Sequence, residues 1–239
     1  MRHRAAPVLA ATLFALATPL HAQLEPQPKP IRAYAGGGLT LAQPVGEFED
    51  FIDGGIGLGG HFLLKLDRAG IFGIRTDAGF VVYGHESRRV CLSTTVGCRV
   101  QVDLNTTNDI AFASIGPQLT FPSGPLQPYV NGSIGVAYFS TRSSIEGLDG
   151  DREDHFATTN FDDLTFAWQA GTGLRVPLRV ARVPVALDVG ARYNTNGRVE
   201  YLREGDIADH ADGSITLHPQ RSQANMVTWL IGATIGIRW

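Results

Sequence analysis

The chain has 239 residues, and its 20 lysines and arginines nearly balance its 23 aspartates and glutamates. A chain without a basic stripe lacks the electrostatic footprint of nucleic-acid binding, so we expect no nucleic-acid partner. The 28 glycines, and the lack of long helix-favouring runs after the start, exclude a helical bundle and favour an all-β fold. A single β-barrel domain commonly uses this length.

The first thirty residues have the order of a secretory signal peptide. Arg2 and Arg4 precede an apolar stretch, Ala5–Leu20, and Ala22 offers a small residue for cleavage. A transmembrane helix is the alternative, but the stretch is short and contains two prolines. The predicted parts are a signal peptide over residues 1–22, a proline-rich periplasmic leader over residues 23–30 and a barrel domain over residues 31–239.

From Ile31 onward, apolar residues alternate with small or polar residues in eight segments. A two-residue period is typical of a strand that has one face in an apolar environment. Each segment is long enough to cross a bilayer as a tilted strand, which takes roughly 9–11 residues. The predicted strands are Ile31–Ala42, Gly55–Leu66, Ile71–Tyr83, Asp109–Phe121, Tyr129–Thr141, Leu164–Val176, Val185–Asn194 and Ala224–Trp239.

The connections between these segments alternate in length. The short ones are Asp67–Gly70, Pro122–Pro128 and Pro177–Pro184, and the long ones are Gln43–Gly54, Gly84–Asn108, Arg142–Asp163 and Thr195–Gln223. Short turns at one end and long polar loops at the other are typical of bacterial outer-membrane barrels. The pattern therefore predicts an eight-stranded antiparallel up-and-down transmembrane β-barrel, with its turns in the periplasm and its four loops outside.

Charged side chains indicate which face of each strand points into the barrel. An arginine on the lipid face costs roughly 2–4 kcal/mol at mid-membrane, so Arg75 should point inward. The same face of this and other strands carries the residues of a predicted lumen network, which are Arg75, Asp77, Gln169, Asp188 and Arg192. We interpret them as a salt-bridged plug of a narrow lumen, and the alternative is a path for protons or ions.

Three further cations lie near the predicted periplasmic mouth. They are Lys65, Arg175 and Arg238, and because each stands close to a strand end we expect them to be solvated. Glycines are frequent on the inward face, for example Gly171 and Gly173. We expect these glycines to leave room for long polar neighbours in the lumen.

The chain ends on WLIGATIGIRW, in which every second residue back from Trp239 is apolar. With the signal peptide, the alternating strands and the unequal connections, this ending resembles the eight-stranded outer-membrane β-barrel family typified by the OmpA transmembrane domain and OmpX. The resemblance implies a location in the cell outer membrane and a C-terminal signal for the barrel assembly machinery. The residues that match this signal are Ala233, Ile235, Ile237 and Trp239.

Aromatic residues near the predicted strand ends are candidates for the girdles that flank a membrane-embedded belt. They are Tyr34, Tyr83, Tyr138, Trp168, Tyr193, Trp229 and Trp239. We expect these rings to lie at the boundaries between lipid and water rather than to stack on a ligand.

The two cysteines of the chain, Cys91 and Cys98, lie in the second long loop. Export permits a disulfide between them, which would contribute about 2 kcal/mol because the closed loop is short. Two cysteines are too few ligands for a metal site. The acidic stretch Glu146–Asp154 alternates carboxylates as a calcium loop does but lacks the required glycine, so we expect neither a metal nor a cofactor.

His85 and Ser87 are similar to the His-x-Ser pair with which some eight-stranded barrels deacylate lipid A. A serine nucleophile also needs a base that an acid orients, and Glu86 would point to the opposite face of the strand. We expect His85 and Ser87 to share the inward face of Arg75 and to point to the lumen or the loop. The chain is therefore predicted not to be an enzyme.

These features favour a membrane-structural or surface-interaction role that long extracellular loops carry out, with the lumen plugged by polar side chains. The expected partners are outer-membrane lipids and lipopolysaccharide, the barrel assembly machinery and an extracellular ligand, and the protein is expected to be a monomer. Two alternatives stay open, because one architecture serves many functions. They are an enzyme that hydrolyses lipid A or phospholipid, and a narrow pore for small solutes.

Overall fold

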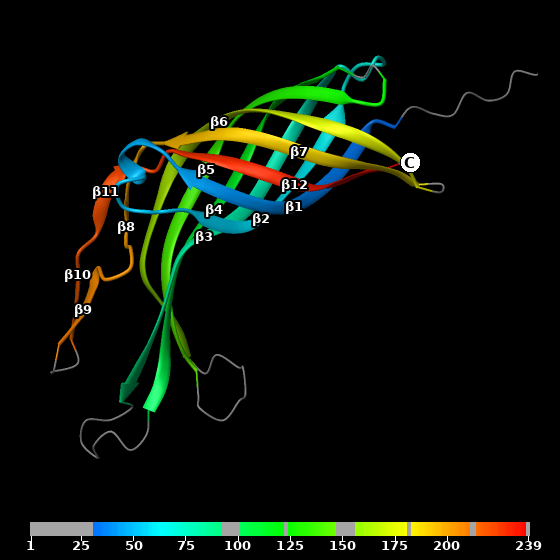
Figure 1. Cartoon of the computed structure of the whole chain (residues 1–239). Helices are drawn as coiled ribbons and strands as arrows, with labels where there is room; N and C mark the ends of the chain where they lie inside the picture. The colour runs from blue at the N-terminus through cyan, green and yellow to red at the C-terminus, as the bar shows by residue number, and fades with distance from the viewer. Residues whose placement is uncertain are drawn as a thin grey trace, which may run out of the picture.

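A computed structural model describes residues 31–91, 101–121, 124–146, 156–180, 183–210 and 214–237. These residues form a closed barrel of eight strands in which each strand is antiparallel to both neighbours (Figure 1). The prediction of an eight-stranded antiparallel barrel is therefore confirmed. The predicted signal peptide and leader lie outside the described residues.

The barrel strands follow one another around the sheet in chain order, and β12 closes the barrel against β1. They are β1 (Ala33–Pro44), β2 (Gly55–Lys65), β3 (Phe72–Cys91), β4 (Gln101–Thr120), β5 (Gln127–Glu146), β6 (Phe156–Val180), β7 (Val183–Asn196) and β12 (Met226–Ile237). Shorter elements are the 3-10 helix η1 (Gly46–Phe48) and the strands β8 (Arg198–Tyr201), β9 (Ile207–Asp209), β10 (Ile215–Leu217) and β11 (Gln220–Gln223). No helix in the described part of the chain has the length and apolar character that crossing a membrane requires.

Pairing of the first and last strands removes the open edges of the sheet. The ladder runs from Ala33 opposite Ile237 to Pro44 opposite Met226. Closure pairs the N–H and C=O groups that an open edge would leave unsatisfied in hydrocarbon. We call the end with the short connections between β2 and β3 and between β4 and β5 the turn end, and the opposite end the loop end.

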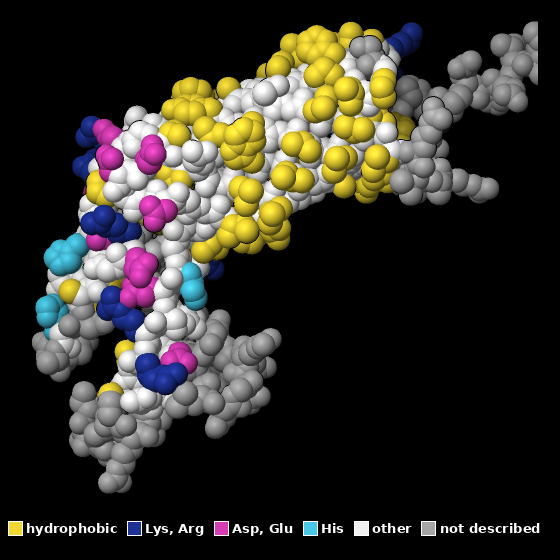
Figure 2. Space-filling view, viewed as in Figure 1, with side chains coloured by type: hydrophobic (Ala, Val, Ile, Leu, Met, Phe, Trp, Pro, Cys, Tyr) yellow, Lys and Arg dark blue, Asp and Glu magenta, His cyan; other side chains and the backbone are white. Residues whose placement is uncertain are grey.

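The outward faces of the barrel strands form a continuous apolar belt (Figure 2). Its exposed side chains include Leu39, Leu58, Phe80, Ile115, Ile134, Leu164, Trp168, Leu187, Trp229 and Ile231. Soluble monomers rarely leave so large an apolar area in contact with water. A belt outside and polar side chains inside are typical of a transmembrane barrel.

The strands β3 to β6 continue well beyond the belt at the loop end (Figure 1). The sequence predicted loops over Gly84–Asn108 and Arg142–Asp163, but β3 reaches Cys91 and β6 begins at Phe156. Those loop boundaries were wrong because pairing with neighbouring strands maintains the ladders where local alternation fades. Strands of 20 and more residues exceed the roughly 9–11 residues that cross a bilayer, so their loop-end parts form a projecting sheet. We call this sheet, which consists of residues 84–91, 101–108, 142–146 and 156–160, the extension.

Two of the predicted loops contain ordered elements that cover the loop end of the barrel. In the first, η1 follows β1 and buries Phe48, which is 1% exposed. In the last, β8 pairs with β11 and β9 pairs with β10. We call η1 together with the β8–β11 pair the cap.

Candidate functional site

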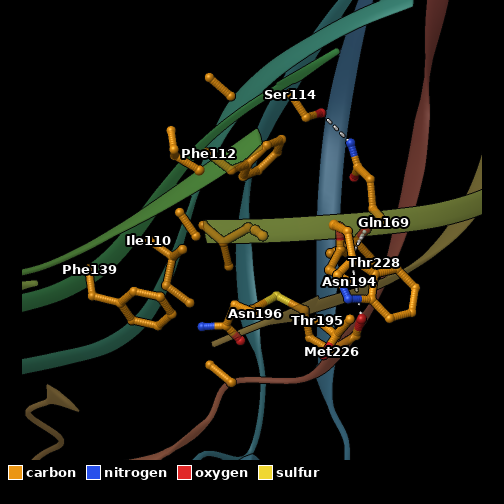
Figure 3. Close-up of a pocket in the computed structure, with 17 residues that line it drawn as sticks. Ile110, Phe112, Ser114, Phe139, Gln169, Asn194, Thr195, Asn196, Met226 and Thr228 are labelled. Carbon is orange, nitrogen blue, oxygen red and sulfur yellow. Dashed lines mark hydrogen bonds between the residues drawn. The ribbon is translucent and has the colours of Figure 1, made fainter. Parts of the chain in front are cut away.

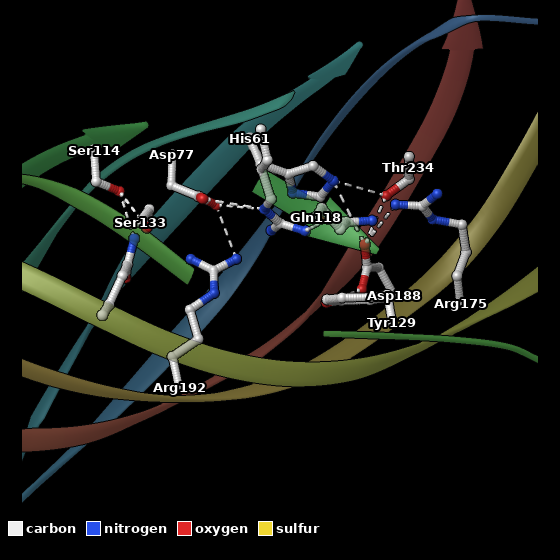
Figure 4. Close-up of polar contacts among 12 residues, drawn as sticks. His61, Asp77, Ser114, Gln118, Tyr129, Ser133, Arg175, Asp188, Arg192 and Thr234 are labelled. Atoms are coloured by element: carbon white, nitrogen blue, oxygen red, sulfur yellow. Dashed lines mark hydrogen bonds and ion pairs between the residues drawn. The ribbon is translucent and has the colours of Figure 1, made fainter. Parts of the chain in front are cut away.

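A network of buried charged side chains fills the turn-end half of the lumen (Figure 4). Arg75 and Asp77 lie two residues apart on β3, so both point inward, and Arg75 Nε donates to Asp77 Oδ1 at 2.9 Å. Arg75 Nη1 donates to Gln118 Oε1 on β4 at 3.0 Å. Arg192, from β7 on the opposite side of the barrel, places Nη2 2.8 Å from Asp77 Oδ1. Asp77 thus links two arginines across the lumen.

A second carboxylate, Asp188 on β7, is fully buried in the same network. Tyr129 Oη donates to its Oδ1 at 2.8 Å, and Thr234 Oγ1 donates to its Oδ2 at 3.0 Å. Arg175 Nη2 lies 3.7 Å and His61 Nε2 lies 3.5 Å from the same Oδ2. This one carboxylate therefore ties together β2, β5, β6, β7 and β12.

Gln169 occupies the adjacent layer of the lumen. Its Nε2 donates to Ser114 Oγ, and Ser133 Oγ donates to the same oxygen at 3.3 Å. The structure thus brings four of the five residues of the predicted network together and places the fifth beside them.

The expectation that Lys65 and Arg175 are solvated is wrong. They are 8% and 1% exposed, respectively. Both lie against the ring of Tyr34, with Lys65 Nζ 5.0 Å and Arg175 Cζ 5.2 Å from its centroid. Nearness to a strand end was a poor guide, because aromatic side chains from other strands cover these cations. Arg238 lies outside the described residues.

Sequence reasoning missed Tyr129, His61 and Gln118 as members of the network. The signal that could have found Tyr129 lies in the inward glycines. A Cβ atom at Gly173 would collide with the ring of Tyr129, and one at Gly171 would lie 2.5 Å from Arg192 Cγ. Glycines on the inward parity therefore mark the places where large side chains from other strands enter the lumen.

The loop-end half of the lumen contains an apolar cluster beside buried polar side chains such as Asn196 and Thr228. The predicted polar plug therefore does not extend unbroken along the whole bore. Phe139 and Met226 from the barrel wall pack with Phe48 and Tyr201 from the cap. The ring centroids of Phe48 and Tyr201 are 5.2 Å apart in an edge-to-face arrangement. A cavity of about 50 Å³ adjoins this cluster. Figure 3 shows Ile110 and Phe139 on one side of this cavity and Gln169 and Thr228 on the other.

One tyrosine hydroxyl group attaches the residue after β8 to the barrel, and a second one joins the two strands of the cap. Tyr83 Oη donates to the carbonyl oxygen of Leu202 at 3.1 Å. Tyr201 Oη lies 2.8 Å from Ser222 Oγ, which joins β8 to β11. Burial raises the pKa of Tyr201, and the bond to Ser222 opposes that rise. Tyr201 therefore stays a neutral hydrogen-bonding group at ordinary pH.

The predicted girdle residues divide between the two faces of the sheet. Four of them, Tyr138, Trp168, Tyr193 and Trp229, are exposed on the outer face as expected. Tyr34 and Tyr83 instead point inward, to the charged network and to the cap respectively, so their assignment to a girdle is wrong. Trp239 lies outside the described residues.

A bulge in β3 reverses which residues face inward near the loop end. Val82 pairs with Asp109, whereas Gly84 pairs with Asn108, so Tyr83 is an extra residue in the ladder. An extra residue shifts the alternation by one, and every later side chain of the strand changes face.

The bulge overturns the predicted orientation of the His-x-Ser pair. His85 and Ser87 do not continue the inward face of Arg75 but are exposed on the outer face of the extension. His85 Nδ1 lies 3.3 Å from Thr107 Oγ1 on the neighbouring strand. Glu86 takes the inner face in their place and lines the cleft described next.

A cleft of about 200 Å³ opens at the loop end between the extension and the β8–β11 region, by which we mean the described residues from β8 to β11 (198–210 and 214–223). Hydroxyl and amide groups form one wall, where Asn160 Nδ2 donates to Ser143 Oγ at 2.6 Å and Thr106 Oγ1 lies 3.0 Å from the same oxygen. The opposite wall contains Arg203 and Ile215. Charged side chains and histidines gather around this region and are absent from the visible belt (Figure 2). The cleft thus presents neutral polar groups with charges of both signs.

Several predicted features lie partly outside the residues that the structure describes. Cys91 ends β3 but Cys98 lies outside the described residues, so their disulfide stays a prediction. Residues 147–155, with most of the acidic stretch, also lie outside. Within the ranges that the structure describes, no group of three or more His, Cys, Asp or Glu residues is arranged to hold a metal ion. Of the predicted assembly signal, Ala233, Ile235 and Ile237 alternate on the outer face of β12.

Solved structures with a similar arrangement of strands are small outer-membrane barrels. A major outer membrane protein from Thermus thermophilus is 13% identical, with 85% of this chain and 99% of that chain covered and a TM-score of 0.44. Ail, the attachment invasion locus protein of Yersinia pestis, is 10% identical, with 86% and 98% covered and a TM-score of 0.41. OprG of Pseudomonas aeruginosa is 13% identical, with 87% and 97% covered and a TM-score of 0.38. No protein-family model and no curated protein sequence matches this chain.

Proposed function

We propose that this chain is an integral outer-membrane protein that binds a ligand at the cell surface and performs no catalysis. The observation that carries the proposal is the cleft between the extension and the β8–β11 region, which opens away from the apolar belt. Binding sites are commonly built on loops that a rigid scaffold positions. Here four long strands supply the scaffold and the cleft supplies the site.

The orientation follows from the two ends of the barrel. Outer-membrane barrels keep their short turns in the periplasm and their long loops outside. The turn end then faces the periplasm, and the extension, cap and cleft stand at the cell surface. Outer-membrane lipids and lipopolysaccharide surround the belt, and the exposed alternate residues of β12 serve as the signal for the assembly machinery.

The contents of the lumen support binding rather than transport. Solutes would have to pass both the charged network around Asp188 and the apolar cluster around Phe139, each formed by buried side chains. Eight-stranded barrels enclose little more than the side chains that fill them. The ring of His85 lies against Thr107 Oγ1, and none of the ion pairs of the described residues joins it to a carboxylate. A serine nucleophile needs a base that an acid orients, so this arrangement supports a role without hydrolysis.

Orientation is tested by labelling intact cells with a membrane-impermeant maleimide, in a background with Cys91→Ser and Cys98→Ser so that only the introduced cysteine reacts. Arg198→Cys lies at the loop end and Arg68→Cys in a turn, and both positions are exposed. We expect the first variant to be labelled in intact cells and the second only after lysis. The reverse pattern, or equal labelling of both, would contradict the proposed orientation.

Ligand binding is tested by exposing cells that display the protein to arrays of glycans and extracellular proteins. Thr158 lines the cleft, while Thr159 is exposed next to it on the opposite face of β6. Thr158→Trp should abolish binding by filling the cleft, and Thr159→Trp should preserve it. Binding that survives Thr158→Trp would place the site elsewhere. No binding by the displayed protein, together with solute flux through it, would refute the proposal in favour of a pore.

A further inference from the structure

Among the described residues, the buried side chains in the turn-end half of the lumen carry more positive than negative charge. Four cations, Lys65, Arg75, Arg175 and Arg192, accompany two carboxylates, Asp77 and Asp188. Burying a charge without a partner is costly, and an arginine cannot relieve the cost by losing its proton. The imbalance therefore calls for a compensating anion inside the barrel.

Among these four cations, Arg175 has the most nitrogen atoms without a hydrogen-bond acceptor in the described part of the chain. Its Nε, Nη1 and Nη2 atoms have no hydrogen-bond partner among the described residues, although the residue is 1% exposed. The nearest carboxylate oxygen, Oδ2 of Asp188, is 3.7 Å away and already accepts a hydrogen bond from Thr234. Figure 4 shows the guanidinium of Arg175 directed toward Asp188. The guanidinium therefore has free donors at the turn end.

Lys65 brings a second cation to the same place. Among the ion pairs of the described residues, which extend to 4.0 Å, none includes Lys65. Lys65 Nζ and Arg175 Cζ both lie within 5.2 Å of the centroid of the Tyr34 ring. An aromatic face attracts a cation but leaves its charge unneutralised. Two cations, of which only Arg175 has a carboxylate within 4.0 Å among the described residues, thus converge on one ring near the turn end of the lumen.

We propose that the turn end of the lumen binds a small inorganic anion, of the class of chloride or phosphate, held by Arg175 and Lys65. This site is separate from the ligand cleft and does not depend on the proposed function. Arg175 is buried inside the barrel, so a lipid headgroup on the outer face of the wall cannot reach it. The anion must therefore be small enough to enter from the aqueous side of the turn end.

The test is the thermal unfolding of the purified full chain in detergent at constant ionic strength, with chloride, phosphate or bulky gluconate as the anion. An anion that binds the folded state stabilises it by mass action. In the saturating range we expect the midpoint to rise by roughly 3–5 °C for each tenfold increase in chloride or phosphate. Gluconate should produce no such rise, and bromide in crystals should give an anomalous peak beside Arg175.

Three glutamine variants separate a site from a general effect of salt. Arg175→Gln and Lys65→Gln should lose the dependence on chloride and phosphate. Arg89→Gln, an exposed arginine of the extension, should retain it. If Arg175→Gln does not fold, Lys65→Gln alone decides the outcome. Equal midpoints of the wild-type protein in all three salts, or an unchanged anion dependence in Lys65→Gln, would overturn the proposal.

Discussion

In the turn-end half of the lumen Asp188 joins Tyr129, Thr234 and Arg175, whereas in the loop-end half Phe139 packs against Tyr201. Both halves lie inside one continuous sheet with the same alternation of inward and outward residues. In the first half the filling side chains come from the barrel wall, and in the second the cap contributes large rings. The difference shows that alternation determines which side chains point into the lumen, but not whether the side chains that fill the lumen are charged or apolar.

The two halves should therefore respond to different substitutions. A charged network depends on matched charges, because a buried charge without its partner is strongly unfavourable. An apolar cluster depends on filled volume, because a truncated ring leaves a cavity. Substitutions of each kind, placed in each half, test this distinction.

The largest expected loss follows removal of the charge on Asp188. Asp188→Asn leaves Arg175 without its nearest carboxylate and should reduce the free energy of unfolding by about 3–5 kcal/mol. Urea unfolding followed by tryptophan fluorescence measures it. The matched control is Asp103→Asn, whose exposed pair with Arg89 should be worth about 1 kcal/mol or less. Similar losses in the two variants would contradict the assignment of a buried network.

A smaller loss, of a different kind, is expected from truncation in the cap. Phe48→Ala removes a ring from the apolar cluster and should cost about 3 kcal/mol, independent of salt concentration. Hydrogen exchange should accelerate in β8 and β11 and stay unchanged at the turn end of β12. Leu126→Ala in an exposed turn serves as the control, with an expected effect within about 0.5 kcal/mol. Faster exchange along the whole barrel would mean that the two halves unfold as one unit.

A substitution that overfills the charged half should reduce the free energy of unfolding by less than Phe48→Ala does. A Cβ atom at Gly173 would enter the space of the Tyr129 ring, so Gly173→Ala should lower the free energy of unfolding by roughly 1–3 kcal/mol. Gly132→Ala is the control, because its nearest atom would be Gln169 O at 3.8 Å, an ordinary contact. Unfolding in urea again supplies the measurement. Equal stability of the two variants would show that the Tyr129 ring can shift to make room for the added methyl group.

The smallest effect concerns a turn outside both halves. The backbone N–H groups of Ile71 and Phe72 donate to Asp67 and lower its pKa. A carboxyl group with a lowered pKa in the folded state stabilises above its unfolded value of about 3.9 and loses that contribution as the pH falls through the folded value. Asp67→Asn should therefore be slightly less stable than the wild type at pH 7.

Unfolding curves of the two proteins recorded across the acid range check this linkage. The wild type and Asp67→Asn should converge as the pH falls below about 4. A constant difference between wild type and Asp67→Asn at every pH would rule out the proton linkage.

Much of the barrel could be predicted because membrane-facing strands carry a strong local signal. The outward positions of Trp229, Ile231 and Ile235 follow directly from the period of two, and the closure of the last strand on the first follows from the need to pair every edge. Arg75 and Asp77 were placed inside by the cost of charge in lipid. These inferences required only near neighbours in the sequence and the properties of the solvent.

The remaining features depend on residues far apart in the chain. Phe48 meets Tyr201, and Tyr83 bonds to Leu202 at a separation of 119 residues. Arg175 is buried because rings from other strands cover it. No local pattern contains such contacts, since they arise only when the closed sheet brings the strands together.

Residue order alone therefore specified the alternation, the eight spans and the apolar belt, because each of these depends on a two-residue repeat against a known solvent. Folding in three dimensions added the bulge at Tyr83, the cap, the extension and the cleft. A one-residue bulge reverses the faces of a strand without changing its composition, and cross-strand pairing lengthens strands where alternation fades. The barrel was readable from the sequence because its signal is local, and the candidate binding cleft was not because it forms between segments.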